Sequence, residues 1–196
     1  MFGLFKKKKA IKIRDVIWKN EAVKYLALID AIGTLDKCII VYFFDDTKQH
    51  FIDVLQHKSI AFDENANASS AISLIKYDKI TSTTAINNRP IIFIEHHPSF
   101  SKEENIKNSL LNEHGIEQIQ FYSSLEDHLF QLFGAERILS LMEKMGYKDN
   151  EVIEHSMISS SIVRAQQKLD SEINYASDTK NRLDWFKINL PANGNF

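Results

Sequence analysis

Glu95, His96 and His97 form the densest group of side chains in the sequence that could carry out chemistry. Imidazole and carboxylate groups bind divalent metals, so these residues are candidates for a metal-dependent enzyme. Adjacent histidines at a strand end point to opposite faces of the sheet, however, and no His-x-x-x-His or His-Glu-x-x-His spacing occurs. We therefore interpret the group as a polar strand end and keep the metal-dependent enzyme as an alternative.

Ser99 and Ser101 lie close to His97 in the sequence, which suggests a nucleophile and its base. A serine hydrolase of this kind holds its nucleophile on a glycine-flanked turn and needs donors for an oxyanion. Neither pattern is present, so we do not predict this chemistry.

Asp45, Asp46 and Thr47 follow an apolar run and open a predicted helix. In open α/β sheets, ligands bind at this position, beyond the carboxyl ends of the strands. A helix N-terminus attracts phosphate, but two carboxylates repel it. We therefore interpret Asp46 as a helix cap. No Gly-Lys pair occurs in the sequence, so the sequence contains no phosphate-binding loop motif.

The elements that would position these residues alternate between strands and helices. Apolar runs predict strands at 38–44, 91–94 and 116–122, with weaker candidates at 59–62 and 80–85. Helical periodicity and capping residues predict helices at 20–32, 47–58 and 101–114, and a helical turn or two at 71–75. Asn20, Ser101 and Ser124 are the predicted caps, and Gly115 a predicted stop. The pattern predicts a three-layer α/β domain with a mostly parallel sheet.

From residue 123 the pattern becomes helical, with helices predicted at 125–133, 135–145 and 157–177. We divide the chain into a basic tail (1–10), an α/β domain (11–122) and a helical extension (123–196). The last helix carries an apolar stripe that we expect to be incompletely covered, and so to bind a protein partner or a second copy of the chain. The predicted partner-binding residues are Ile158, Ile162, Leu169, Ile173, Trp185 and Phe186.

Charge separates the N-terminal tail from the rest of the chain. Residues 1–14 hold six basic side chains, and the remainder holds 18 basic against 26 acidic ones. An acidic body repels a phosphate backbone, so nucleic-acid binding is not predicted. The tail pairs apolar and basic side chains, as in weak contacts with anionic membrane surfaces; the alternative is a solvated end. The residues of this predicted contact are Phe2, Leu4, Phe5, Lys6, Lys7, Lys8 and Lys9.

Cellular location is predicted from the same sequence. Cys38 is the only cysteine, which favours a reducing compartment. No apolar stretch approaches the ~20 residues of a membrane span, and Phe2 and its neighbours precede the lysines, unlike a secretory signal. We expect a cytoplasmic protein, with peripheral contact at the inner membrane as an additional option.

Residues 124–138 read Ser-Leu-Glu-Asp-His-Leu-Phe-Gln-Leu-Phe-Gly-Ala-Glu-Arg-Ile. This segment resembles the junction in the SecA protein-translocation ATPase where the second RecA-like motor domain passes into the helical scaffold. The resemblance continues through 142–146, 152–155 and 165–169, and a weaker one extends over 11–175. It implies a RecA-like α/β domain followed by a scaffold-like extension. The helix that enters the SecA motor domain is similar to residues 15–31.

The departures from SecA concern ATP hydrolysis. The strand similar to 91–97 is followed in SecA by a Gln-x-x-Gly-Arg-x-Gly-Arg motif whose arginines contact nucleotide phosphates. Here residues 105–115 contain Lys107 and no arginine, and residues 81–88, where a glycine- and arginine-rich motif should fall, contain neither residue. Loss of an arginine finger costs about 10³–10⁵ in rate.

These departures predict a non-catalytic, SecA-like interaction module without a cofactor. It would bind SecA or another translocon-associated protein, or form a homodimer. The alternatives are nucleotide binding without hydrolysis and a metal-dependent enzyme using Glu95, His96 and His97.

Overall fold

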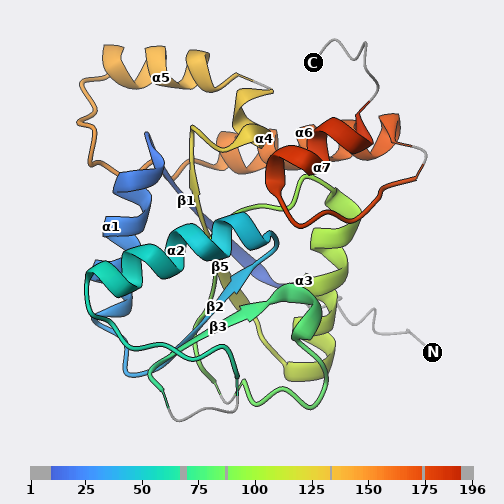
Figure 1. Ribbon diagram of the computed structural model, residues 1–196. Coiled ribbons are helices and arrows are strands. Elements are labelled where there is room, and N and C mark those ends of the chain that lie inside the picture. Colours follow the sequence, from blue (N-terminus) through green and yellow to red (C-terminus); the bar gives the residue numbers. More distant parts are fainter. Residues whose placement is uncertain (1–9, 67–69, 87, 133, 174, 191–196) are drawn as a thin grey trace, which may run out of the picture.

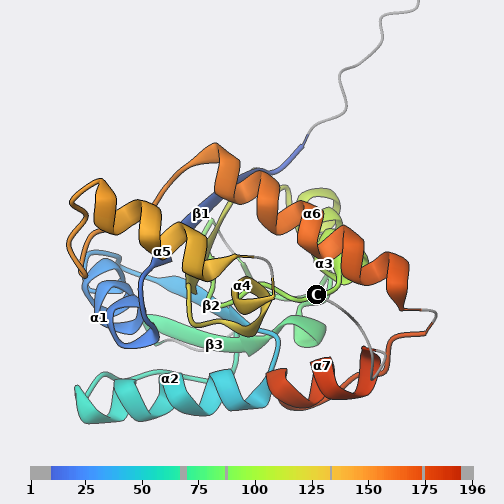
Figure 2. The same cartoon turned by 90° about the horizontal axis from the view of Figure 1, so that it is seen from above.

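A computed structural model describes residues 10–66, 70–86, 88–132, 134–173 and 175–190. Its centre is a five-stranded sheet in the order β1-β5-β4-β2-β3, in which every pairing is parallel. The strands are β1 (Lys12–Trp18), β2 (Cys38–Tyr42), β3 (Ile72–Lys76), β4 (Ile91–Phe93) and β5 (Gln118–Ser124). Helices cover both faces of this sheet, so the predicted three-layer α/β architecture is confirmed (Figures 1 and 2).

The two faces of the sheet carry separate apolar cores. Along β2, Cys38, Ile40 and Tyr42 pack with α1 (Glu21–Ile32) and α2 (Asp45–His57). Ile39 and Val41 point to the other face, where α3 (Phe100–His114) and α6 (Ser156–Glu172) lie. Period-two alternation of buried side chains explains why this strand is apolar throughout.

The predicted helix ends are partly confirmed. Asn20 caps α1, because its Oδ1 accepts the N–H of Val23 at 2.9 Å. Gly115 ends α3 in the left-handed conformation, with φ of 66°, which favours glycine. The prediction that Ser101 caps this helix is wrong. Ser99 is the cap, because its Oγ accepts the N–H of Lys102 at 3.4 Å.

Several predicted elements near the sheet edges are wrong. Residues 12–18 form edge strand β1, although 15–19 were expected in a helix, because they pair in register with β5. Residues 72–76 form β3 rather than helical turns, because β2 offers them a parallel partner. The candidates at 59–62 and 80–85 are not strands, and a short 3₁₀ helix, η1 (Tyr77–Lys79), precedes the latter.

The helical part lies against the α/β layers rather than apart from them. It comprises α4 (His128–Gln131), α5 (Ala135–Lys144), α6 and α7 (Arg182–Asn189). Buried side chains of α6 and α7 share one core with the face of the sheet that α3 covers. Figure 2 shows α6 above the sheet and α7 next to the start of α2. Among the described residues, no helix is both long and apolar enough to span a membrane.

Candidate functional site

The candidate site lies beyond the carboxyl ends of β2 and β4. From β2 the chain passes through α2 to β3 on one side, whereas β4 continues through α3 to β5 on the other. Because α2 and α3 cover opposite faces, the two strand ends form a topological switch point, where ligands of open α/β sheets bind. The predicted chemical residues, Glu95 to His97 and Asp45 to Thr47, meet at this edge.

Glu95 is buried and holds the turn between β2 and α2. Its Oε1 accepts the N–H groups of Phe43 and Phe44 at 2.8 and 2.9 Å. Its Oε2 accepts the hydroxyl of Thr47 at 2.5 Å. Burial raises the pKa of Glu95 to about 7, against the lowering effect of Arg182 and of these hydrogen bonds. The carboxylate therefore organises the backbone from inside the fold.

His96 is the central cation of a buried acid–base cluster. Its Nδ1 lies 3.0 Å from Glu103 Oε2, and its Nε2 lies at ion-pair distance, 3.4 Å, from Asp15 Oδ1. Burial alone would lower the pKa of His96, but the Glu103 and Asp15 carboxylates raise it to about 10. The ring also stacks on Phe121, with centroids 4.2 Å apart. His96 is therefore a charged residue that joins β1, β4 and α3.

His97 differs from His96 in its charge state. Its ring stacks on Phe44 and meets Trp185 edge-on, with centroids 5.4 and 5.6 Å apart. Burial lowers its pKa to about 3, with a further contribution from Lys102, so the ring is neutral. Its Nδ1 accepts the N–H of Ser99 rather than a hydroxyl proton.

The sequence triplet 95–97 is thus divided among three local environments. Within the described ranges, no group of three His, Cys, Asp or Glu side chains is placed to hold a metal ion. The Oγ atoms of Ser99 and Ser101 lie 3.0 Å apart. The His97 Nδ1 atom, which would be the base for Ser99, already accepts the backbone N–H of Ser99. The arrangement does not bring the predicted metal ligands, or a nucleophile and base, together.

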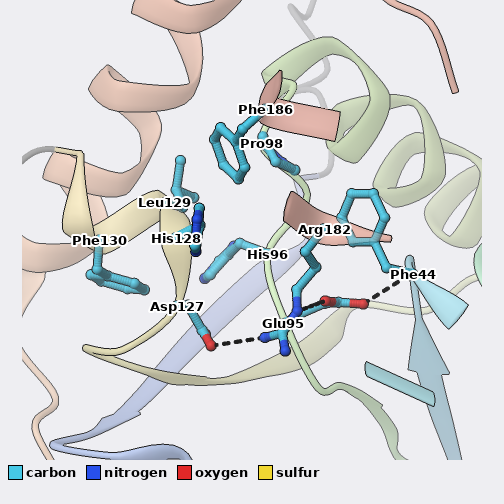
Figure 3. A pocket seen from close by; sticks show the side chains of 10 residues that line it. All are labelled: Phe44, Glu95, His96, Pro98, Asp127, His128, Leu129, Phe130, Arg182 and Phe186. Carbon is cyan, nitrogen blue, oxygen red and sulfur yellow. Dashed lines mark hydrogen bonds and ion pairs between the residues drawn. The ribbon is translucent and has the colours of Figure 1, made fainter. Parts of the chain in front are cut away.

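Arg182 of α7 is the side chain around which the acidic residues gather (Figure 3). Its guanidinium is 3.3 Å from Glu21 Oε1, 3.4 Å from Asp46 Oδ2, 3.3 Å from Asp127 Oδ1 and 3.9 Å from Glu95 Oε2. We call these four acids the carboxylate cluster. Burial would lower the pKa of Arg182, but the four carboxylates raise it above its usual range.

Lys24 supplies a second cation from inside α1. Its side chain is fully buried, and its Nζ donates to the carbonyl oxygen of Ile94 at 3.2 Å. The same atom lies 3.6 Å from Glu21 and 3.7 Å from Asp127. Two basic side chains, Lys24 of α1 and Arg182 of α7, therefore neighbour the carboxylate cluster.

An open cleft adjoins this network. It has a volume of about 160 Å³, and carboxylates of the cluster form much of its wall. The lining residues are Glu21, Asp46, Glu126, Asp127, His128, Arg182 and Leu183. A smaller cavity of about 10 Å³, drawn in Figure 3, lies next to Arg182 and is lined by apolar and polar side chains in equal number. The outer cleft suits a positively charged or hydrogen-bond-donating group better than a phosphate.

Asp46 has a different role from the predicted one. The α2 N-cap position is Phe44, and no side chain caps it. Asp46 instead accepts the backbone N–H of Arg182 at 3.2 Å through Oδ1. The sequence shows that Asp46 is an acceptor at a helix start. It does not show that the helix it serves is a distant one.

The expectation that the apolar stripe of α6 is incompletely covered is wrong at its centre. Ile162, Leu169, Trp185 and Phe186 are buried within the chain, and Ile158 and Ile173 pack against the same core. The reason is that α6 packs on α3 and shares the core on that face of the sheet. Gln166, a buried residue of the stripe that sequence reasoning passed over, adds polar contacts there. Its Nε2 donates to His97 O at 2.7 Å and to Glu103 Oε2 at 2.9 Å, which fixes α6 on α3.

The predicted membrane contact, from Phe2 to Lys9, lies outside the described residues. Of the residues that matter most at the site, Lys24, Glu103, Gln166 and Arg182 were not predicted. Each is a polar residue on a helix, and polar helix residues are usually solvated. Nothing in their spacing distinguishes them from the exposed polar residues beside them.

Comparison with known proteins gives a local match. No family model matches the chain. A 51-residue stretch is 61% identical to the protein translocase subunit SecA of Cytophaga hutchinsonii, and one of the same length is 63% identical to that of Christiangramia forsetii. A 52-residue stretch is 52% identical to the SecA of Chlorobium phaeobacteroides strain BS1. Each match covers 26% of this chain and 5% of the relative.

The chain therefore contains a SecA-like segment, and the predicted resemblance is confirmed for that stretch. The match spans about one twentieth of the length of the SecA proteins.

Proposed function

We propose that this chain, which carries a SecA-like segment, is a non-catalytic interaction module that assists protein translocation by binding SecA or another translocon-associated protein. One observation carries the proposal. A chain that is 63% identical over 51 residues to one SecA has carboxylates around its own Arg182 at the edge of the sheet where open α/β folds bind ligands. Because these carboxylates disfavour phosphate groups, we infer that the chain binds a protein partner and does not turn over ATP.

The charges at the site are unfavourable for phosphoryl transfer. Phosphoryl transfer needs cations directed at the transferring group, and the carboxylate cluster repels that group. Lys107, the basic residue of 105–115, is buried and pairs with Glu103 and Glu104 of its own helix. Arg89, next to 81–88, donates to Ser73 Oγ and to backbone carbonyls. These two cations are already committed within the fold.

The proposed partner surface lies on the exposed apolar side chains of the helical part. Met145 and Met157 are 63% and 69% exposed, and methionine suits adaptable protein contacts. The centre of the α6 stripe is not part of this surface, because its side chains are buried. Contact of residues 2–9 with an anionic membrane surface is a second part of the proposal.

The experiment is binding of purified SecA from the same organism to the immobilised full chain. We expect saturable binding that weakens when Met145 and Met157 are both replaced by Asp. Leu26→Asp, at a position on α1 that is 50% exposed, is the matched control and should bind as the wild type does. No binding of SecA, with ATP or without it, would contradict SecA as the partner. Bound zinc or manganese in stoichiometric amount would favour the metal-dependent alternative.

A further inference from the structure

Residues 175–190, which we call the strap, run over the carboxyl edge of the sheet and end in α7. The N–H of Asp45 donates to Lys180 O at 2.6 Å, and Asp46 accepts the N–H of Arg182. Trp185 is fully buried against His97. The strap thus covers the switch point, and Figure 3 shows Arg182 pointing toward Glu95 and Asp127.

One side chain of the strap ties together parts of the fold that are distant in sequence. The carboxylates that contact Arg182 come from α1, α2, the end of β4 and the turn before α4. Without the guanidinium these four acids would face one another, with Lys24 beside Glu21 and Asp127. Removing one partner from a buried charge network is costly, because the remaining charges lose their compensation.

The strap is a short segment that is partly open to solvent. An eight-residue helix such as α7 is not stable alone, because helix nucleation is unfavourable. Tyr175 is 86% exposed and Ile188 is 61% exposed, so much of the segment faces solvent. Its attachment combines the Arg182 network, the buried pair Trp185 and Phe186, the ion pair of Asp178 with Lys102, and the hydrogen bond from Asp45 to Lys180 O. Segments with few buried contacts open locally before the protein unfolds.

We propose that the strap is a conformational latch, held closed by Arg182 in the carboxylate cluster, and that it opens as a unit when this ion-pair network is broken. Closed, it occupies the edge where an open α/β sheet receives ligands. The cleft of about 160 Å³ stays open beside the closed strap, and opening of the strap would expose more of this edge. The latch involves residues of this chain alone, so it can be tested independently of the proposed function.

The test is hydrogen–deuterium exchange of the full chain, read at the α7 amides, including Trp185 and Leu190, which are hydrogen-bonded within the strap. Arg182→Ala should speed their exchange by about tenfold or more, while amides of β2 and α3 keep their protection. Arg14→Ala is the matched control, because its guanidinium binds Glu154, away from the strap, at 2.6 and 3.0 Å. It should leave α7 exchange unchanged.

Salt gives a second readout that an attachment through apolar contacts alone would not show. Raising ionic strength should speed α7 exchange in the wild type and have less effect in Arg182→Ala, because the screened network is already gone. If Arg182→Ala does not fold, Asp46→Asn, at a carboxylate that is 29% exposed, should show the same effect in smaller measure. Unchanged α7 exchange, or equal acceleration in β2, would overturn the proposal.

Discussion

Gln166 of α6 and Glu103 of α3 share a hydrogen bond of 2.9 Å between Nε2 and Oε2 inside the protein. The same amide nitrogen donates to His97 O at 2.7 Å, so one side chain connects the helical part to the end of β4. Glu103 in turn holds His96. The helix that we expected to offer its apolar stripe to a partner is therefore fixed to the α/β layers by a polar contact within the stripe.

Replacing Gln166 with Leu should lower the free energy of unfolding by ~1–3 kcal/mol, because the His97 carbonyl loses its donor in a buried place. Denaturant unfolding measures this change. Gln167→Leu is the control, since Gln167 is exposed and adjacent, and should change stability by less than ~0.5 kcal/mol. Equal stability of the two variants would show that the connection is not energetically important.

His96 should make stability fall as pH rises between 6.5 and 10. Its folded pKa is about 10 and its ordinary value is 6.5, so in this range the folded state holds a proton that the unfolded state has lost. Its contribution is fully present below pH 6.5 and is lost through pH 10, with a slope of at most ~1.4 kcal/mol per pH unit. His96→Gln should remove this part of the slope in urea unfolding at several pH values.

The control for the pH series is His57→Gln, at an exposed position on α2. It should shift the stability curve little and leave its slope between pH 6.5 and 10 as in the wild type. A His96→Gln curve parallel to the wild-type curve over this range would contradict a charged His96 in the folded protein.

The N-terminal tail should add salt-sensitive affinity for anionic vesicles. Each lysine near such a surface contributes about 1 kcal/mol, and salt screens that attraction. Co-sedimentation with phosphatidylserine-containing vesicles should fall when residues 1–10 are deleted or when Lys6 to Lys9 are replaced by Gln. Sedimentation that is the same with and without the tail would leave it a solvated end.

The parts of the fold that sequence reasoning predicted are those with a local cause. The apolar run from Cys38, the Asn20 cap and the stop at Gly115 each depend on residues a few positions apart, and each is confirmed. The edge strand β1 was missed because its first residues are exposed, and only its end is buried. Its strand state follows from pairing with β5, which is remote in sequence.

The candidate site was not predicted, because Asp46 was interpreted as a helix cap and Glu95 as part of a polar strand end. Asp46 and Glu95 were recognised as polar residues after buried strands, where ligands bind. The partner that organises them, Arg182, comes from the far end of the chain and has no spacing that links it to them. Burial of Ile162 and Leu169 likewise depends on how α6 packs on α3, which periodicity alone cannot decide.

The central claim is that this chain binds a partner without turning over ATP, because its ligand edge holds carboxylates and Arg182 in place of phosphate-binding groups. Phosphate release from ATP with Mg²⁺ by the highly purified full chain tests it most directly, with the wild type and Arg182→Ala measured side by side. The account predicts release at buffer background for both proteins, since opening the strap exposes acids. Release above background that disappears in Glu95→Gln or Asp46→Asn would contradict it.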